Sequence, residues 1–133
     1  MKNNIDKFKA NMGKLQAYYS PDALADKIKH AAKKAGAKAV YYALILYYAS
    51  LDKEIPAKDR LMILAALGYF ILPADLIPDM VPGGFADDTA ALMYVLRKVW
   101  HNITPAVREK ARARTNRLFG NIPEGDIEDP VAQ

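Results

Sequence analysis

Several residue types and patterns are missing from this chain of 133 residues, and each absence excludes a class of protein. There is no cysteine, which excludes disulfides, thiolate metal sites and cysteine nucleophiles. The residues after Met1 contain no apolar stretch typical of a signal peptide, so we expect none to be present. A protein without cysteine also fits a reducing compartment. We therefore expect a cytoplasmic location.

Long uninterrupted apolar runs are also missing, although two stretches come near the about 20 residues that a membrane-spanning helix needs. Residues 39–51 are uncharged over thirteen positions, and residues 61–74 over fourteen, but the second stretch contains Pro73. Stretches of this length are more often buried core helices than membrane segments. We expect both to form the centre of the fold, and a shallow re-entrant hairpin is the alternative.

The residues that are present indicate an ordered globular domain, with 52% apolar and 26% charged residues. Apolar residues recur at spacings of three and four, which is typical of helices, and no convincing run shows the period of a strand. We predict an all-α fold, a single compact irregular bundle of five to six helices over residues 1–120, followed by an acidic, frayed tail at 121–133. The expected helices cover approximately residues 5–19, 21–35, 38–51, 57–72, 86–101 and 105–119.

Local signals support several of these helix ends. Ser20 and Thr104 each precede a proline at the first helical position, so we expect both to be N-caps and not nucleophiles. Gly36 is expected to end the second helix. Paired tyrosines at 41–42 and 47–48 fall in the most apolar helix, where we expect their rings in the core and their hydroxyls at its rim.

The segment between the fourth and fifth expected helices is the one long irregular stretch inside the domain. Three prolines and a glycine pair break it repeatedly, and it carries several carboxylates. We predict that the functional loop consists of Pro73, Asp75, Pro78, Asp79, Pro82, Asp87 and Asp88.

The order of residues in this loop resembles the YkvA-like family, a bacterial domain of unknown function. The resemblance rests on an aromatic residue, then Pro73-Ala74-Asp75-Leu76-Ile77-Pro78-Asp79, Pro82, a Gly-containing turn, Asp87-Asp88 and an apolar helix, over about residues 65–97. The turn at residues 82–85 is shorter and richer in glycine than that pattern. The resemblance implies a small helical domain, often near or on membranes, with no established reaction.

The carboxylates of this loop allow two interpretations. As structural groups they would cap short helices or accept backbone hydrogen bonds, and this is the commonest use of such residues. As functional groups, Asp75, Asp79 and Asp88 would converge on a hard cation such as Mg²⁺ or Ca²⁺, which prefers oxygen ligands. That second interpretation makes the chain a metal-binding protein or a metal-dependent enzyme. Helical spacing places Asp88 on the same face as Leu92, Val95 and Val99, whereas Asp87 lies on another face.

Charge is distributed unevenly along this basic chain, whose net charge is +4. Residues 1–38 and 97–120 each carry a net charge of +6, and the segments that follow them each carry −4. The first expected helix pairs its lysines with an apolar face of Ile5, Phe8, Met12 and Leu15. The sixth expected helix is rich in arginine, with a narrow apolar stripe of Val107, Ala111, Leu118 and Phe119.

These two basic helices carry the best functional hypothesis, a non-enzymatic interaction module that associates peripherally with an anionic membrane or with a membrane protein. The residues expected to bind the anionic surface are Lys7, Lys9, Lys14, Arg108, Arg112, Arg114 and Arg117. Such a protein would lie at the inner face of the membrane. Nucleic-acid binding through the sixth helix alone is the less favoured alternative. No cofactor is expected beyond the metal alternative, since His30 and His101 make no ligand pattern, and the sequence leaves the oligomeric state open.

Overall fold

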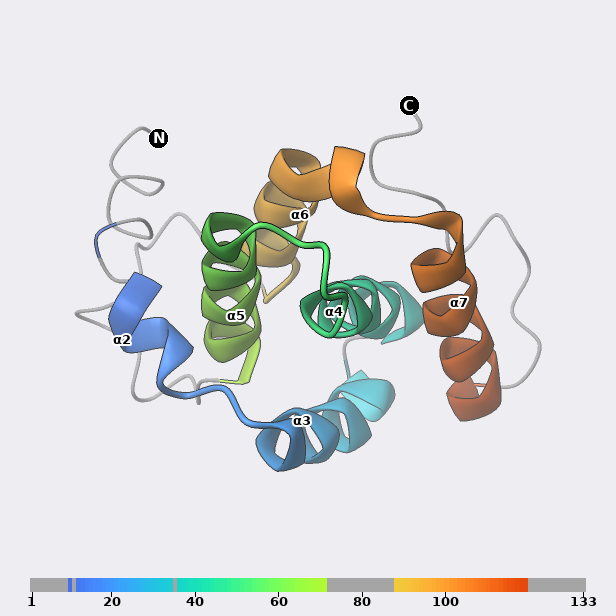
Figure 1. Ribbon diagram of the computed structural model, residues 1–133. Coiled ribbons are helices and arrows are strands. Elements are labelled where there is room, and N and C mark those ends of the chain that lie inside the picture. The colour runs from blue at the N-terminus through green and yellow to red at the C-terminus, as the bar shows by residue number, and fades with distance from the viewer. Residues whose placement is uncertain (1–9, 11, 35, 72–87, 120–133) are drawn as a thin grey trace.

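The computed structural model describes residues 10, 12–34, 36–71 and 88–119. This part of the chain contains helices and no strand, which confirms the all-α prediction (Figure 1). The elements are α2 (Met12–Gln16), α3 (Pro21–Lys34), α4 (Gly36–Ser50), α5 (Ala57–Ile71), α6 (Asp88–Val99), the 3-10 helix η2 (Trp100–Asn102) and α7 (Pro105–Phe119). The predicted domain limit at residue 120 and the tail at 121–133 lie outside the described residues.

Helix α4 is the centre of the bundle. It packs against α3, α5, α6 and α7, and Figure 1 shows it nearly end-on with these helices around it. The apolar residues of α4 surround the helix axis, so every side of it has to be covered by another element. Tyr41, Ile45 and Leu46 are completely buried, while Tyr47 and Tyr48 lie half-buried at the rim. The prediction for the paired tyrosines is confirmed for the rings of Tyr41 and Tyr42, but these two side chains are buried together with their hydroxyls, so only Tyr47 and Tyr48 reach the rim.

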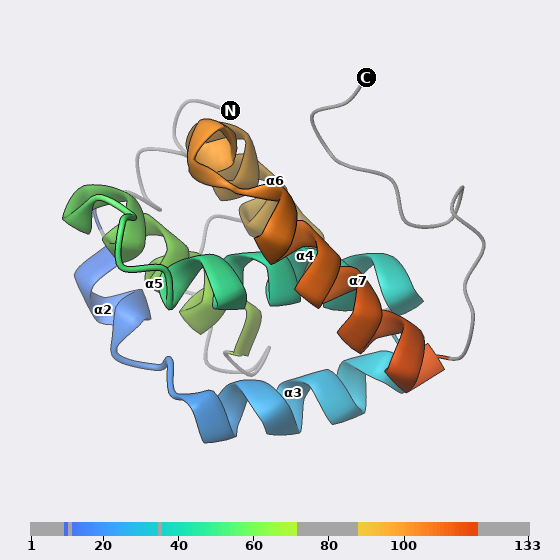
Figure 2. The ribbon, with the colours of Figure 1, turned by 45° about the vertical axis from the view of Figure 1, so that its right-hand side comes forward.

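Helix α2 lies across α5 on the outer side of the bundle (Figures 1 and 2). Leu15 of α2 is fully buried, and Met12 packs partly against the same core. The close approach is possible because α5 has Gly68 at the crossing, where any Cβ would overlap the carbonyl oxygen of Leu15. The described part of the first expected helix is thus a member of the bundle, with its apolar face turned inward.

Side-chain caps fix the starts of two helices, as the sequence predicted. The backbone N–H of Ala23 donates to Ser20 Oγ at 3.0 Å, and that of Val107 donates to Thr104 Oγ1 at 3.2 Å. The second helix was predicted to end before Gly36, and α3 does end at Lys34, but Gly36 is also the first residue of α4. Glycine marks a break in helical propensity, but it does not determine which of two adjacent helices contains it.

The turn between α4 and α5 is held by the side chain of Arg60. Its Nε donates to the carbonyl of Ser50 at 3.2 Å, and its Nη2 donates to the carbonyl of Asp52 at 2.7 Å. Ser50 is the last residue of α4 and Asp52 lies two residues beyond it, where backbone acceptors have no partner within the helix. This contact fixes the position of Leu51, whose side chain is 59% exposed.

Candidate functional site

Most of the predicted functional loop lies outside the described residues. This applies to Pro73, Asp75, Pro78, Asp79, Pro82 and Asp87. Asp88 is the first residue of α6, but its side chain is also outside the described part, whereas Leu92 and Val99 on the helix that follows are fully buried as expected. In the part of the chain that the structure describes, no three acidic or histidine side chains gather into a metal site. The proposed Mg²⁺ or Ca²⁺ ligands therefore stay a prediction.

Lys14 and the basic residues of α7 fall on opposite sides of the bundle. Lys7 and Lys9 lie outside the described residues, and Lys14 is exposed on α2. Helix α7 is at the other edge, separated from α2 by α5 and α4 (Figures 1 and 2). Lys14 and the basic residues of α7 therefore do not form the single docking surface that the sequence predicted. The sequence pattern predicted two basic helices. It could not predict on which side of the bundle each helix lies.

Helix α7 packs against α4 with a narrow face. Val107 and Ala111 are buried there, as predicted, and Phe119 is partly buried. The prediction for Leu118 is wrong, because its side chain is 41% exposed. Thr115 is buried in the contact instead, since its hydroxyl is satisfied by donating to the carbonyl of Ala111 at 2.7 Å.

Three arginines of α7 contact aromatic side chains of the domain, two of them over a ring and one at a hydroxyl. The guanidinium of Arg108 lies 5.4 Å from the ring centre of Trp100, and that of Arg112 lies 5.5 Å from the ring centre of Tyr41. Arg114 donates from Nη1 to the hydroxyl of Tyr48 at 3.4 Å. Contacts between a guanidinium and an aromatic ring, as for Arg108 and Arg112, stabilise by roughly 0.5–2 kcal/mol and limit the rotation of the long side chain. The positive charges along α7 are therefore held in place on the domain surface.

One face of α7 combines positive charge with exposed leucine, and we name it the docking face. Lys110, Arg114 and Leu118 follow one another at four-residue steps, so they lie on one side of the helix, and Arg117 lies beside them. Leu51 adjoins this row, because it lines the same shallow depression as Lys110. The docking face consists of Leu51, Lys110, Arg114, Arg117 and Leu118.

Among the residues that the structure describes, acidic groups are few around the docking face. Glu109, the one acid on α7, borders a different depression together with Tyr41, Arg108 and Arg112. Asp52 lies at the edge of the depression shared by Leu51 and Lys110, where its Oδ1 accepts a hydrogen bond from the backbone N–H of Glu54. The face therefore has a net positive charge, with three basic side chains beside one carboxylate.

A buried hydrogen-bonded pair joins α5 to η2, and the sequence did not predict it. Asn102 of η2 donates from Nδ2 to Asp59 Oδ2 at 2.6 Å, and Asp59 is only 8% exposed. One signal could have found the aspartate, since it lies four residues before Ile63 on the buried face of α5. Its partner is 43 residues away, so spacing alone could not identify it.

The helices of the described part include none that is both long enough and apolar enough to cross a membrane. Residues 59–94 match the model of a family described as a protein of unknown function, DUF1232. The match covers α5, the segment after it and the first half of α6, which is just over a quarter of the chain. It supports the expected resemblance to an uncharacterised domain family, while the name YkvA-like stays an expectation. No curated protein and no solved structure matches the chain.

Proposed function

We propose that this chain is a non-enzymatic interaction module that associates peripherally with an anionic membrane through the docking face of α7. The observation that carries the proposal is the combination of Lys110, Arg114 and Arg117 with two exposed leucines on one face. Among the described residues, only Tyr18, Leu51 and Leu118 are large hydrophobic side chains with substantial exposure, and two of these three belong to the docking face.

A peripheral protein stays on a membrane through positive charge and exposed apolar side chains together. Each Lys or Arg near an anionic leaflet contributes about 1 kcal/mol, and this attraction weakens as salt shortens the screening length. Leu51, at 59% exposure, and Leu118, at 41%, can add an apolar contribution at the boundary of headgroups and acyl chains. A leucine that moves fully from water into such an environment gains about 1.5–3 kcal/mol, so each partial transfer gains less.

The exposed leucines favour a membrane over a nucleic acid. A phosphate backbone would attract the same arginines, but its contacts are ionic and hydrogen-bonded and make no use of a leucine. Stacking on single-stranded bases would require exposed aromatic rings. Tyr41 is fully buried under Arg112, and Trp100 is half-buried beside Arg108. The aromatic rings next to α7 therefore hold arginines and are not open platforms.

The direct test is flotation with phosphatidylcholine vesicles that contain or lack phosphatidylglycerol. We expect binding only to the acidic vesicles, and less of it at high salt. Changing Lys110, Arg114 and Arg117 together to Gln should weaken this binding by about 3 kcal/mol, or roughly a hundredfold. The matched control removes the same charge elsewhere, at the exposed residues Lys14, Lys29 and Arg97.

The control variant should keep most of its binding, because its substitutions lie away from the docking face. Equal losses in the two variants would contradict the proposal, since only the net charge would then matter. Duplex DNA provides the other comparison. If DNA binds as tightly as the acidic vesicles, and if exchanging Leu51 and Leu118 for Ser affects neither, the chain is a nucleic-acid-binding protein and the membrane proposal is wrong.

A further inference from the structure

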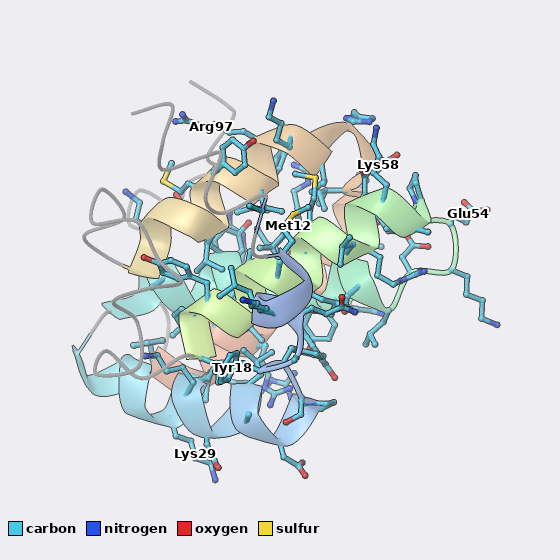
Figure 3. All side chains as sticks on the ribbon, turned by 90° about the vertical axis from the view of Figure 1, so that its left-hand side faces the viewer. Met12, Tyr18, Lys29, Glu54, Lys58 and Arg97 are labelled. Carbon is cyan, nitrogen blue, oxygen red and sulfur yellow. The ribbon has the colours of Figure 1, made fainter. Side chains whose placement is uncertain are left out.

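A cavity of about 490 Å³ lies between α2, α5, α6 and η2, and none of its lining residues comes from α7. Its size falls within the usual range for small-molecule sites, about 300–1,000 Å³. Figure 3 shows two residues of its border, Met12 where α2 crosses α5 and Lys58 in the first turn of α5. The cavity is thus separate from the docking face, and its function can be tested separately.

One part of the cavity wall is apolar and adaptable. Met12 of α2 meets Leu61 and Met62 of α5 there, and all three side chains are only partly buried. Methionine side chains are unbranched and polarizable, so they adjust to ligands of irregular shape. The two helices that contribute these residues are fixed by the core, because Leu15 of α2 and Ile63 of α5 are fully buried. This wall is suited to a short alkyl chain.

The rest of the wall carries positive charge. Lys58 and Lys98 come from α5 and α6, and His101 from η2. The ammonium of Lys98 lies 5.7 Å from the ring centre of Tyr94, which also lines the cavity. Neither lysine forms an ion pair with any of the residues that the structure describes. Two cations from different helices therefore border a largely apolar space.

Among the described residues that line the cavity, the one carboxylate is already engaged. Asp59 accepts the hydrogen bond from Asn102 at 2.6 Å, and it lies in the first turn of α5, where the helix dipole stabilises a negative charge. Its negative charge is therefore stabilised without either lysine. With two lysines against this single aspartate, the cavity has a net charge of +1 before His101 is protonated.

We propose that this cavity binds a small amphipathic anion, a medium-length alkyl carboxylate whose chain contacts Met12, Leu61 and Met62 and whose head group lies between Lys58 and Lys98. Charge complementarity selects the head group, and the apolar wall selects the chain. The inference extends beyond membrane docking, because it assigns a soluble ligand to a site that contains no residue of the docking face.

The test is calorimetric titration of the whole protein with decanoate below its micelle concentration, beside decanol and acetate. Decanoate should bind saturably, decanol more weakly because it lacks the charge, and acetate not at all in the same range. Decanoate should also raise the melting temperature, because a ligand that binds only the native state stabilises it. A fall in melting temperature would show detergent-like unfolding and would overturn the proposal.

Variants locate the site. Lys58→Gln and Lys98→Gln should each weaken decanoate about fivefold, as expected for a partly exposed ion pair worth about 1 kcal/mol, and leave decanol unchanged. The matched control Lys53→Gln removes an exposed lysine from the turn between α4 and α5 and should not change the affinity for decanoate.

A second experiment uses methyl NMR spectra. Decanoate should shift the signals of Met12 and Met62 but not that of Met93, which does not line the cavity. Unchanged affinity in both lysine variants, or shifts confined to Met93, would overturn the assignment.

Discussion

The backbone of Leu15 lies directly against Gly68 at the point where α2 crosses α5. The carbonyl oxygen of Leu15 occupies the space that a Cβ on residue 68 would fill. Both residues are fully enclosed, so neither helix can move outward without exposing the Leu15 side chain. This contact is what joins the short helix α2 to the rest of the bundle.

Gly68→Ala should therefore destabilise the protein despite the higher helix propensity of alanine. The added methyl group overlaps backbone atoms, which cannot rotate away, and overpacking of this kind costs about 1–3 kcal/mol or more. Urea unfolding followed by circular dichroism would measure the loss. Gly13→Ala is the control, because nothing lies within 4 Å of the position of its Cβ. That variant should be neutral or more stable by up to about 1 kcal/mol, and an equal loss at both positions would contradict the crossing geometry.

Asn102→Ala should cost about 1–3 kcal/mol, because it leaves the buried carboxylate of Asp59 without its hydrogen-bond donor. His101→Ala is the neighbouring control, and this exposed residue should change stability by no more than about 0.5 kcal/mol. A double variant that also changes Asp59 to Asn should lose less than the sum of the two single losses, which thermal unfolding would show. Additive losses would mean that the two side chains act independently.

Alkaline pH should weaken the fold in part through Tyr19. Burial raises the pKa of Tyr19 above its usual value of 10.0, the nearby Tyr47 raises this pKa further, and the hydrogen bond with Ser50 acts in the opposite direction. A tyrosine whose pKa is raised on folding contributes stability that is present below pH 10 and is lost as the pH rises through the folded-state value. Tyr19→Phe should therefore lose less stability than the natural chain above pH 10, as measured by urea unfolding at a series of pH values. Parallel losses in the two proteins would contradict the role of Tyr19.

Exchanging both Leu51 and Leu118 for Ser should weaken vesicle binding by a similar factor at low and high salt. The contribution that it removes is apolar, and screening acts only on the charges. Both side chains are substantially exposed, so the fold should keep its stability within about 0.5 kcal/mol. Flotation at two salt concentrations, with Tyr18→Ser as the control for an exposed apolar residue elsewhere, would check this prediction. An effect that disappears at high salt would show that the leucines do not enter the membrane.

The helices could be predicted from the sequence because their signals are local. Thr104 and Pro105 mark the start of α7 with residues that fix one hydrogen bond and one backbone angle, and neither depends on the rest of the fold. The burial of Tyr41 could likewise be predicted, since apolar residues surround α4 on all sides. Leu118 was placed wrongly because it lies at the border between the buried row of α7 and the docking face, and its position in the last turn leaves its side chain exposed.

The candidate sites depend on contacts between distant segments, and these are what the sequence could not supply. Lys58 and Lys98 border one cavity although they are 40 positions apart, and no spacing rule connects them. Leu51 belongs to the docking face only because the turn after α4 brings it to Lys110. In contrast, the opposite placement of α2 and α7 separated two basic segments that the charge pattern had suggested would act together.

The central position of α4 has a consequence for the folding of the protein during its synthesis on the ribosome. One side of this apolar helix is covered by α7, which is synthesised long after it. The 69 residues from Ser50 to Phe119 take roughly 3 to 14 s to add at about 5–20 residues per second. During that interval the rings of Tyr41 and Tyr48 lack the helix that later covers them, and transiently exposed apolar surface of this kind is prone to aggregation. The last described helix is therefore also the step that ends the aggregation-prone period of synthesis.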